Sequence, residues 1–240
     1  MRNRSSFLAA ATIAACAGVL AAAGPASASR AGCVAAARGA RVVVEDSRGL
    51  VYIRHGRARS CYFGSGRISA LQGQGRRALP FNGQLLAGTA AVDPSWVRMA
   101  GRFVAYEVRF TSDKAVSSID GPYTTVRVIS FDTRSGRTRY SAGFSDSTGP
   151  FVDALVVKPN GSVAWMYGHS HRDLEDYTTV VKMDTMTGGE EHGLDGDDIH
   201  PHGYTIEPGS LGLSSSGTRI YWHASSADVP KQRNLSAPLQ

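Results

Sequence analysis

The sequence has few cysteines, few lysines and no sustained helical pattern, and each shortage narrows what the protein can be. Only three of its 240 residues are cysteine, and charged residues make up 19%. No segment keeps a helical apolar period across three turns, so a helical fold is not expected. Phosphate-cradling glycine loops and dinucleotide-binding fingerprints are also missing. With 42% hydrophobic residues, the chain fits a folded domain and excludes a multi-pass membrane protein or a long disordered chain.

Arginine carries almost all of the basic charge, because only 4 of the 26 basic residues are lysine. Together with abundant alanine and glycine, this bias is typical of a GC-rich genome, and no nucleic-acid partner is expected. Residues 29–150 hold 18 basic and 8 acidic side chains, whereas residues 151–240 hold 6 and 12. Either the first part presents a basic face to an anionic polymer, or the two parts attract each other within one compact domain.

The N-terminal segment has the three parts of a secretory signal peptide. Arg2 and Arg4 supply positive charge, residues 7–23 are apolar and alanine-rich, and Ala26-Ser27-Ala28 offers a cleavage site between small residues. We therefore expect residues 1–28 to be removed and residues 29–240 to form a single domain. The protein would then be secreted or held in the cell envelope, with no membrane span. A retained anchor and lipidation at Cys16 are the alternatives.

Signal cleavage would leave Cys33 and Cys61 as an even pair in an oxidising compartment. A disulfide between them would tie the N-terminal arm to the first strands, and the chain-entropy model assigns such a loop about 3.5 kcal/mol. Two buried thiols, or a metal pair, are the other interpretations of these cysteines.

Strand signals dominate the rest of the chain, and they repeat. Asn160-Gly161, between two apolar runs, predicts a hairpin. A glycine turn followed by a strand with an aromatic residue recurs four times, at intervals of 52, 60 and 56 residues. We expect these aromatic residues to pack in the core rather than to form a ligand platform. The glycines are Gly49, Gly101, Gly161 and Gly217, and the aromatic residues are Tyr52, Tyr106, Trp165 and Trp222.

A second repeated motif extends each unit. Tyr-Thr-Thr-Val occurs at residues 123–126 and 177–180, and each copy leads to a strand and an Asp-to-Gly turn, at 132–136 and 184–188. A four-stranded unit cannot bury both of its faces alone, so neighbouring units must stack face to face. We predict an all-β, β-propeller-like fold with about four four-stranded repeats, as a small closed ring or an open partial propeller. The repeats span approximately residues 41–94, 95–150, 151–204 and 205–240.

These units resemble the blades of secreted β-propeller-like proteins of the TolB-type and WD-repeat superfamily, in a short form without the Trp-Asp dipeptide. The likeness is carried by residues 156–165 and 211–222 and by the turns at Asp132 and Asp184. It implies a scaffold or a module that binds partners. In this arrangement residues 72–94 would be a loop between blades, and residues 233–239 a strand that pairs with the N-terminal unit to close the ring.

Histidine pairs are the most specific candidates for a metal site. His169 with His171, and His200 with His202, could each project two imidazoles to one side of extended backbone. Two such loops at one end of neighbouring units would supply four nitrogen donors, the number that zinc prefers. Solvated loop histidines are the alternative. Calcium at residues 195–198 is a further alternative, although the sequence lacks the other ligands of a calcium-binding loop. The first expectation is that the protein binds no cofactor.

The functional hypothesis is an exported, non-enzymatic binding or scaffold module. Variable loops on a rigid repeat are a natural recognition surface, here for an envelope polymer or a protein partner. The alternative is a secreted, metal-assisted hydrolase or lyase that uses the four histidines with a nearby carboxylate.

Overall fold

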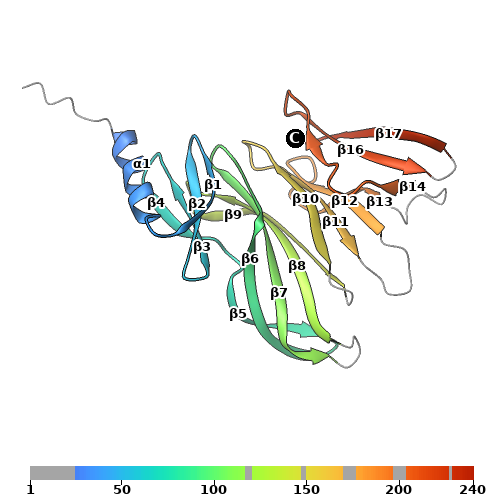
Figure 1. Cartoon of the computed structure of the whole chain (residues 1–240), viewed down its shortest axis with the longest axis horizontal. Helices are drawn as coiled ribbons and strands as arrows, with labels where there is room; N and C mark the ends of the chain where they lie inside the picture. Colours follow the sequence, from blue (N-terminus) through green and yellow to red (C-terminus); the bar gives the residue numbers. More distant parts are fainter. Residues whose placement is uncertain (1–24, 117–120, 147–149, 170–176, 197–203, 227–228) are drawn as a thin grey trace, which may run out of the picture.

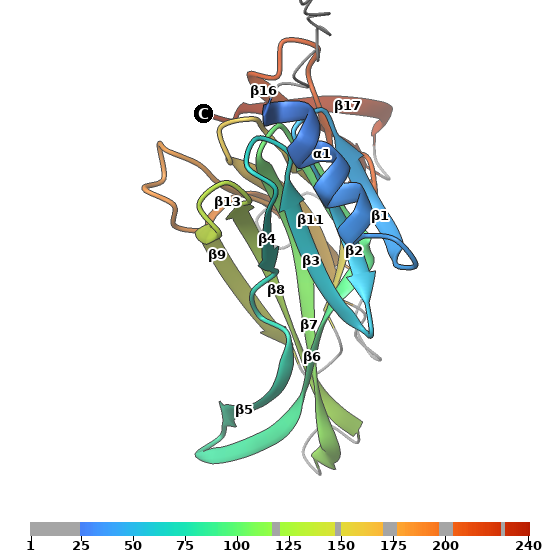
Figure 2. The same cartoon turned by 90° about the vertical axis from the view of Figure 1, so that its left-hand side faces the viewer.

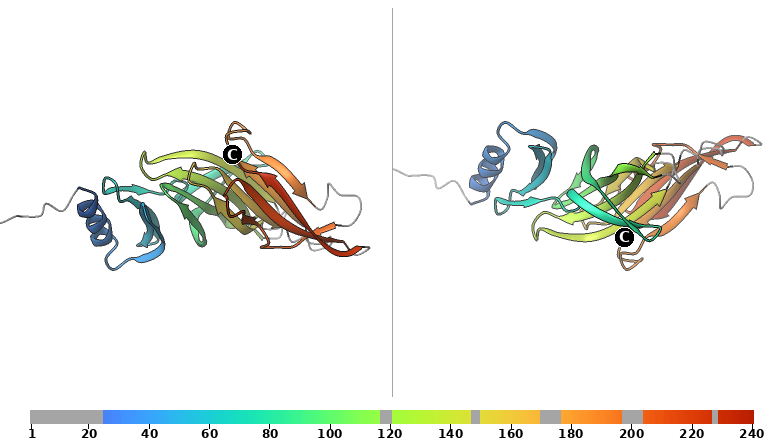
Figure 3. Two further views of the ribbon diagram at one scale, coloured as in Figure 1. Left: turned by 90° about the horizontal axis from the view of Figure 1, so that it is seen from above. Right: turned by 90° about the horizontal axis from the view of Figure 1, so that it is seen from below.

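The computed structural model describes residues 25–116, 121–146, 150–169, 177–196, 204–226 and 229–240. Most of these residues lie in strands, and the helix among them is α1 (Pro25–Ala36). Four antiparallel sheets follow one another in space, with α1 at one end of the stack and the C-terminal sheet at the other (Figures 1 and 3). The prediction of an all-β fold is therefore confirmed, and three of the four sheets have the expected four strands, whereas the second has five.

The first three sheets are simple meanders, in which each strand pairs with the next along the chain. The first sheet contains β1 (Arg41–Asp46), β2 (Gly49–Arg54), β3 (Arg57–Tyr62) and β4 (Arg67–Ala70). The second contains β5 (Gly75–Phe81), β6 (Gln84–Ala100), β7 (Phe103–Val116), β8 (Gly121–Asp132) and β9 (Arg137–Asp146). The third contains β10 (Phe151–Val157), β11 (Val163–His169), β12 (Tyr177–Met183) and β13 (His192–Gly196).

The fourth sheet is built around β16 (Arg219–Ser226). Along one edge of β16 lie two short strands, β14 (Tyr204–Ile206) and β15 (Gly212–Leu213), and along the other lies β17 (Val229–Pro238). The second sheet also differs from the first and third sheets. Its long strands extend past the stack and curl at their far ends (Figure 2).

The repeated turns occupy equivalent places in these sheets. Gly101, Gly161 and Gly217 lie in the hairpins before β7, β11 and β16, and all three have positive φ. The predicted hairpin at Asn160-Gly161 is confirmed: Lys158 donates its backbone N–H to the Ser162 carbonyl, and β10 pairs with β11. Gly161 has a φ of 93°, a conformation that an L-residue adopts only at a steric cost. The repeat is thus a property of the backbone as well as of the sequence in these three units, whereas Gly49 is the first residue of β2 and does not have positive φ.

The Asp-to-Gly turns also match each other. Asp132 accepts the Arg134 N–H at 2.9 Å between β8 and β9, and Asp184 accepts the Met186 N–H at 2.9 Å between β12 and β13. A short carboxylate that accepts an N–H two residues on stabilises a tight turn. The two Tyr-Thr-Thr-Val copies lie in β8 and β12, the strands that lead into these turns.

The core consists of layers between successive sheets. One apolar cluster joins the first sheet to the second, another joins the second to the third, and another joins the third to the fourth. Successive side chains of a strand point to opposite faces of its sheet and pack in different clusters. In β7, Val104 and Tyr106 face the first sheet, while Phe103 and Ala105 face the third. The four repeated aromatic residues are all buried, as expected: Tyr52, Tyr106, Trp165 and Trp222.

Helix α1 covers the outer face of the first sheet and was not predicted. It lies across β1 to β3 (Figure 2), and Cys33 and Ala37 pack with Leu50, Tyr52 and Phe63. Alanine has the highest helix propensity, but the twelve residues of α1, PASASRAGCVAA, carry no large apolar side chains at helical spacing. The predicted cleavage point after Ala28 falls within α1, and signal cleavage stays a prediction.

Two parts of the predicted architecture were wrong. Residues 72–94 are not a loop between blades, because β5 and the first half of β6 form a hairpin there with a turn at Asn82-Gly83, both in positive φ. The second sheet therefore begins before the expected unit boundary at residue 94. The last strand does not pair with the first sheet: β17 pairs with β16. In the described part of the chain, the apolar clusters show an open series of sheets and no closed ring.

Candidate binding surfaces

The predicted metal site falls mostly outside the described residues. The backbone of His169 ends β11, whereas His171, His200 and His202, with Asp197 and Asp198, lie outside the residues that the structure describes. Within the described ranges, no three His, Cys, Asp or Glu side chains are grouped so that they could hold a metal ion. The zinc and calcium hypotheses stay predictions.

The predicted disulfide is present. Cys33 of α1 and Cys61 of β3 are joined, with 5.6 Å between their Cα atoms. Both cysteines are fully buried between α1 and the first sheet, so the bond holds the helix on the sheet. The alternatives of two free thiols or a metal pair are thereby excluded.

Five exposed arginines gather at one end of the first sheet, and we call them the arginine end: Arg38, Arg41, Arg54, Arg57 and Arg59. The fold brings two segments together here. Arg54 and Arg57 are directly opposite each other at the hairpin between β2 and β3. Arg41 pairs with Ile53 next to Arg54, and Arg54 donates to the Arg38 carbonyl at 3.3 Å. The segment after α1 and the hairpin of β2 and β3 thus place their arginines at the same end of the first sheet.

Few acidic groups neutralise the arginine end. Arg54 donates to the carbonyls of Ala36 and Arg38 at the C-terminus of α1, where a cation interacts favourably with the helix dipole. The other four form no ion pair with any described residue. The two acidic residues of the first sheet, Glu45 and Asp46, lie at the opposite end of β1. There Glu45 pairs with Arg30 at 2.7 Å, and Asp46 accepts the Gly101 N–H at 2.8 Å.

Among the residues that the structure describes, no ion pair joins the two oppositely charged parts of the chain. Every ion pair between described residues joins two residues of the same part, either before or after residue 150. The layer between the second and third sheets, where the parts meet, is an apolar cluster. The ion pairs are Arg30–Glu45, Arg76–Asp113, Arg102–Asp132, Arg109–Glu107, Lys182–Asp184 and His223–Glu207.

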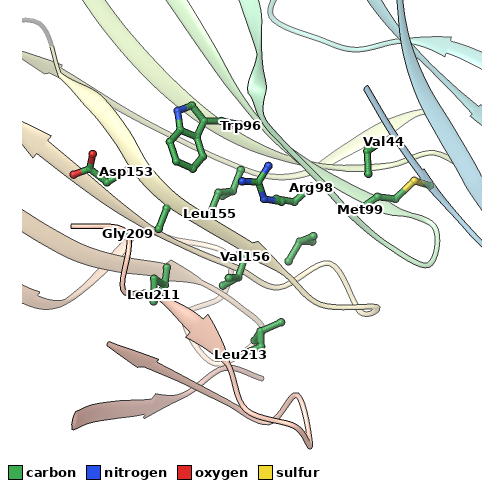
Figure 4. Close-up of a pocket in the computed structure, with 12 residues that line it drawn as sticks. Val44, Trp96, Arg98, Met99, Asp153, Leu155, Val156, Gly209, Leu211 and Leu213 are labelled. Carbon is green, nitrogen blue, oxygen red and sulfur yellow. The ribbon is translucent and has the colours of Figure 1, made fainter. Parts of the chain in front are cut away.

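A groove of about 560 Å³ lies beside β1, β6, β10 and the segment that includes Gly209, Leu211 and Leu213 (Figure 4). Its walls come from all four sheets: Val44 of β1, Trp96 and Arg98 of β6, residues 153–157 of β10, and the segment 209–213. In β1, β6 and β10 the regular pairing is interrupted by a bulge beside the groove. Bulges redirect side chains and are frequent next to functional sites.

The bulge in β6 places Trp96 and Arg98 at the groove. Pairing with β7 breaks between Val92 and Val97, where Pro94 has no N–H to donate to a neighbouring strand. The Arg98 guanidinium lies 5.4 Å from the centre of the Trp96 ring. It also donates to the carbonyls of Ser95 and Val97 at 2.9 and 3.1 Å, so several contacts hold its position.

The bulge in β10 falls on Asp153. Its neighbours Val152 and Ala154 pair with Tyr167 and Met166, and Asp153 is left out of the register. The Oδ2 atom of Asp153 is buried and has no hydrogen-bond partner among the described residues. Burial raises the pKa of this carboxyl group above its usual value. A Cβ atom on Gly168 would lie 3.1 Å from Oδ2, so this glycine leaves room beside the carboxylate.

Sequence reasoning did not find the groove. Trp96, Arg98 and Asp153 belong to no repeated motif, and the Asp-Pro in the middle of β6 resembles a loop signal rather than a strand bulge. A comparison with models of known protein families finds no match to this chain, and no curated protein matches it. No helix in the described part of the chain has the length and hydropathy needed to cross a membrane.

Proposed function

We propose that the protein is an exported, non-enzymatic binding module that holds an anionic polymer of the cell envelope at the arginine end. The observation that carries this proposal is a surface of five exposed arginines without acidic partners among the described residues. The stack of antiparallel sheets, most of them four-stranded, also supports kinship with TolB-type and WD-repeat propellers, scaffolds that mostly bind partners. Disulfide-linked Cys33 and Cys61 fit an oxidising compartment outside the cytoplasm.

The arrangement of Arg54 and Arg57 favours binding over a structural role. Like charges directly opposite each other on neighbouring strands are destabilising, and Arg57 makes no hydrogen bond or ion pair with a described residue that would offset this cost. An anionic polymer would supply the missing counter-charges. The contacts would be formed largely by exposed guanidinium groups, so binding should weaken as salt screens them.

The double substitution Arg57→Gln/Arg59→Gln should weaken the binding of dextran sulfate at low salt. Two lost cation contacts at about 1 kcal/mol each correspond to roughly 30-fold in affinity. The thermal midpoint should stay the same or rise, because the substitution removes the repulsion between Arg57 and Arg54. Titration calorimetry at two salt concentrations, with neutral dextran as the reference polymer, measures the effect.

The matched control removes the same number of positive charges at positions outside the arginine end. Arg76 is paired with Asp113 at 2.6 Å, and Arg219 is hydrogen-bonded to Ser236 at 2.9 Å in the fourth sheet. The Arg76→Gln/Arg219→Gln variant should bind almost as the unchanged protein does. Equal weakening in both double variants would mean that overall charge, and not the arginine end, attracts the polymer.

The metal-assisted enzyme remains the competing hypothesis, and metal content separates the two. The binding module should purify without stoichiometric zinc. If zinc is present at one ion per chain and is lost in a His169→Ala/His171→Ala variant, the enzyme hypothesis gains and the proposal of a metal-free module fails.

A further inference from the structure

We propose that the groove beside β1, β6 and β10 is a second binding site, and that it takes a zwitterionic ligand with an aliphatic body. The ammonium group would face Asp153, the carboxylate would face Arg98, and the aliphatic part would lie on Leu155, Leu211 and Leu213 (Figure 4). This site shares no residue with the arginine end and does not depend on the function proposed for it.

Asp153 supplies the negative charge of the groove. Its partly buried side chain lines the groove, and no described residue donates a hydrogen bond to its Oδ2 atom, which is costly for a carboxylate oxygen. Asp153 forms no ion pair with Arg98, so the two charges are separate in the groove. An ammonium group is a compact cation with three donors, and it would return the raised pKa of Asp153 toward its usual value.

Arg98 supplies the opposite charge. Its guanidinium is exposed and held in place by Trp96 and by two backbone carbonyls, and a fixed guanidinium matches the geometry of a carboxylate. The same contacts argue against a stacked sugar ring, because Arg98 lies over the Trp96 ring and Trp96 packs against the cluster between the second and third sheets. The ring is already in contact with protein where a sugar would have to stack.

The rest of the groove suits an aliphatic chain. Leu155 and Leu211 are buried, Val156 and Leu213 are partly buried, and none of them brings a polar side-chain atom. Pockets for small ligands usually enclose a few hundred Å³ and combine an apolar lining with a small number of placed polar groups. A volume of about 560 Å³ accommodates a short amino acid with a terminal ammonium group.

The test is titration calorimetry with 6-aminohexanoate, hexylamine, hexanoate and hexanol. The zwitterion should bind at least about tenfold more tightly than either singly charged probe, and hexanol should bind most weakly. Shorter and longer ω-amino acids, 4-aminobutanoate and 8-aminooctanoate, would show an optimum that measures the separation of the two charges. Trp96 is only partly buried, whereas Trp165 and Trp222 are almost fully buried, so intrinsic fluorescence should report the same binding.

Two substitutions assign the charges. Asp153→Asn should reduce the affinity for 6-aminohexanoate to that for hexanoate, and Arg98→Gln should reduce it to that for hexylamine. Asp113→Asn, on β7 outside the groove, is the control and should change nothing. The proposal is overturned if no probe binds, if hexanol binds as well as the zwitterion, if both groove variants bind normally, or if N-acetylglucosamine binds instead and depends on Trp96.

Discussion

Replacing Asp184 with alanine should lower the free energy of unfolding by about 3–5 kcal/mol, the usual cost of breaking a buried ion pair. The Asp184 side chain is fully buried, and it lies 2.9 Å from the Lys182 ammonium group, which is itself only 8% exposed. It also accepts N–H groups from Met186 and Thr187, and one from Gln240 after the last strand. Urea denaturation followed by circular dichroism measures the loss.

Asp132 is the matched control because it occupies the equivalent turn of the second sheet. It accepts the Arg134 N–H at 2.9 Å, but its nearest cation, Arg102, is 3.5 Å away and partly exposed. Asp132→Ala should cost about 1 kcal/mol, the value of an ordinary turn hydrogen bond. In the Asp184→Ala background, Lys182→Met should restore part of the stability, since it removes the unpaired buried charge. Equal costs for the two aspartates would contradict this account.

The same aspartate predicts a pH dependence. Burial pushes the pKa of Asp184 upward, but hydrogen bonds from Gln240, Lys182 and Thr187 outweigh burial and hold it below the usual value. A carboxyl group with a lowered pKa in the folded state stabilises fully above its unfolded pKa of about 4 and loses this contribution as the pH falls further. The stability difference between the unchanged protein and Asp184→Ala should therefore narrow below about pH 4.

Removing the disulfide should cost about 3.5 kcal/mol, the chain-entropy value for a loop of this size. Cys33 and Cys61 are 28 residues apart in sequence, and the bond connects α1 to a sheet face that includes Leu50, Tyr52 and Phe63. In a Cys33→Ser/Cys61→Ser variant, α1 should separate first and expose this face. Urea denaturation gives the stability, and hydrogen exchange should show early loss of protection in α1.

Two comparisons test the disulfide prediction. The unchanged protein with reductant should unfold at the same urea concentration as the double serine variant without it. Val34→Ala changes an exposed residue of the same helix and should have almost no effect. A loss below about 1 kcal/mol in the serine variant would mean that packing alone holds α1 on the sheet.

The sequence predicted the strands and turns well where local chemistry controls the backbone. Gly161 and Gly217 mark turns because positive φ favours glycine, and Asp132 and Asp184 mark turns because their carboxylates bind nearby N–H groups. The hairpin at Asn82-Gly83 had the same strong signal. The glycine, alanine and proline around it favour a loop, and this conflicting pattern led to the wrong prediction for residues 72–94.

The pairing of the last strand was predicted wrongly, and the N-terminal helix was not predicted, for a different reason. Whether residues 229–238 pair with β16 or with the first sheet depends on contacts far apart in the chain. In the structure Lys158 and Ser162 of the third sheet bind the carbonyls of Leu239 and Gln240, so the end of the chain lies on the third sheet. Helix α1 packs through Cys33 on an apolar face of the first sheet that includes Leu50 and Tyr52, and a short helix gains most of its stability from such packing.

By itself the sequence determined the all-β class, the repeated strand-and-turn unit and the cysteine pair, since periodicity, turn chemistry and cysteine number are local properties. The tertiary structure alone decided that the sheets form an open series, that arginines from two segments meet at one end of the first sheet, and that Trp96, Arg98 and Asp153 line one groove. These features come from residues more than ten positions apart and from bulges that interrupt the regular pairing. Alternating patterns cannot locate them, because a bulge shifts every later side chain relative to its neighbours.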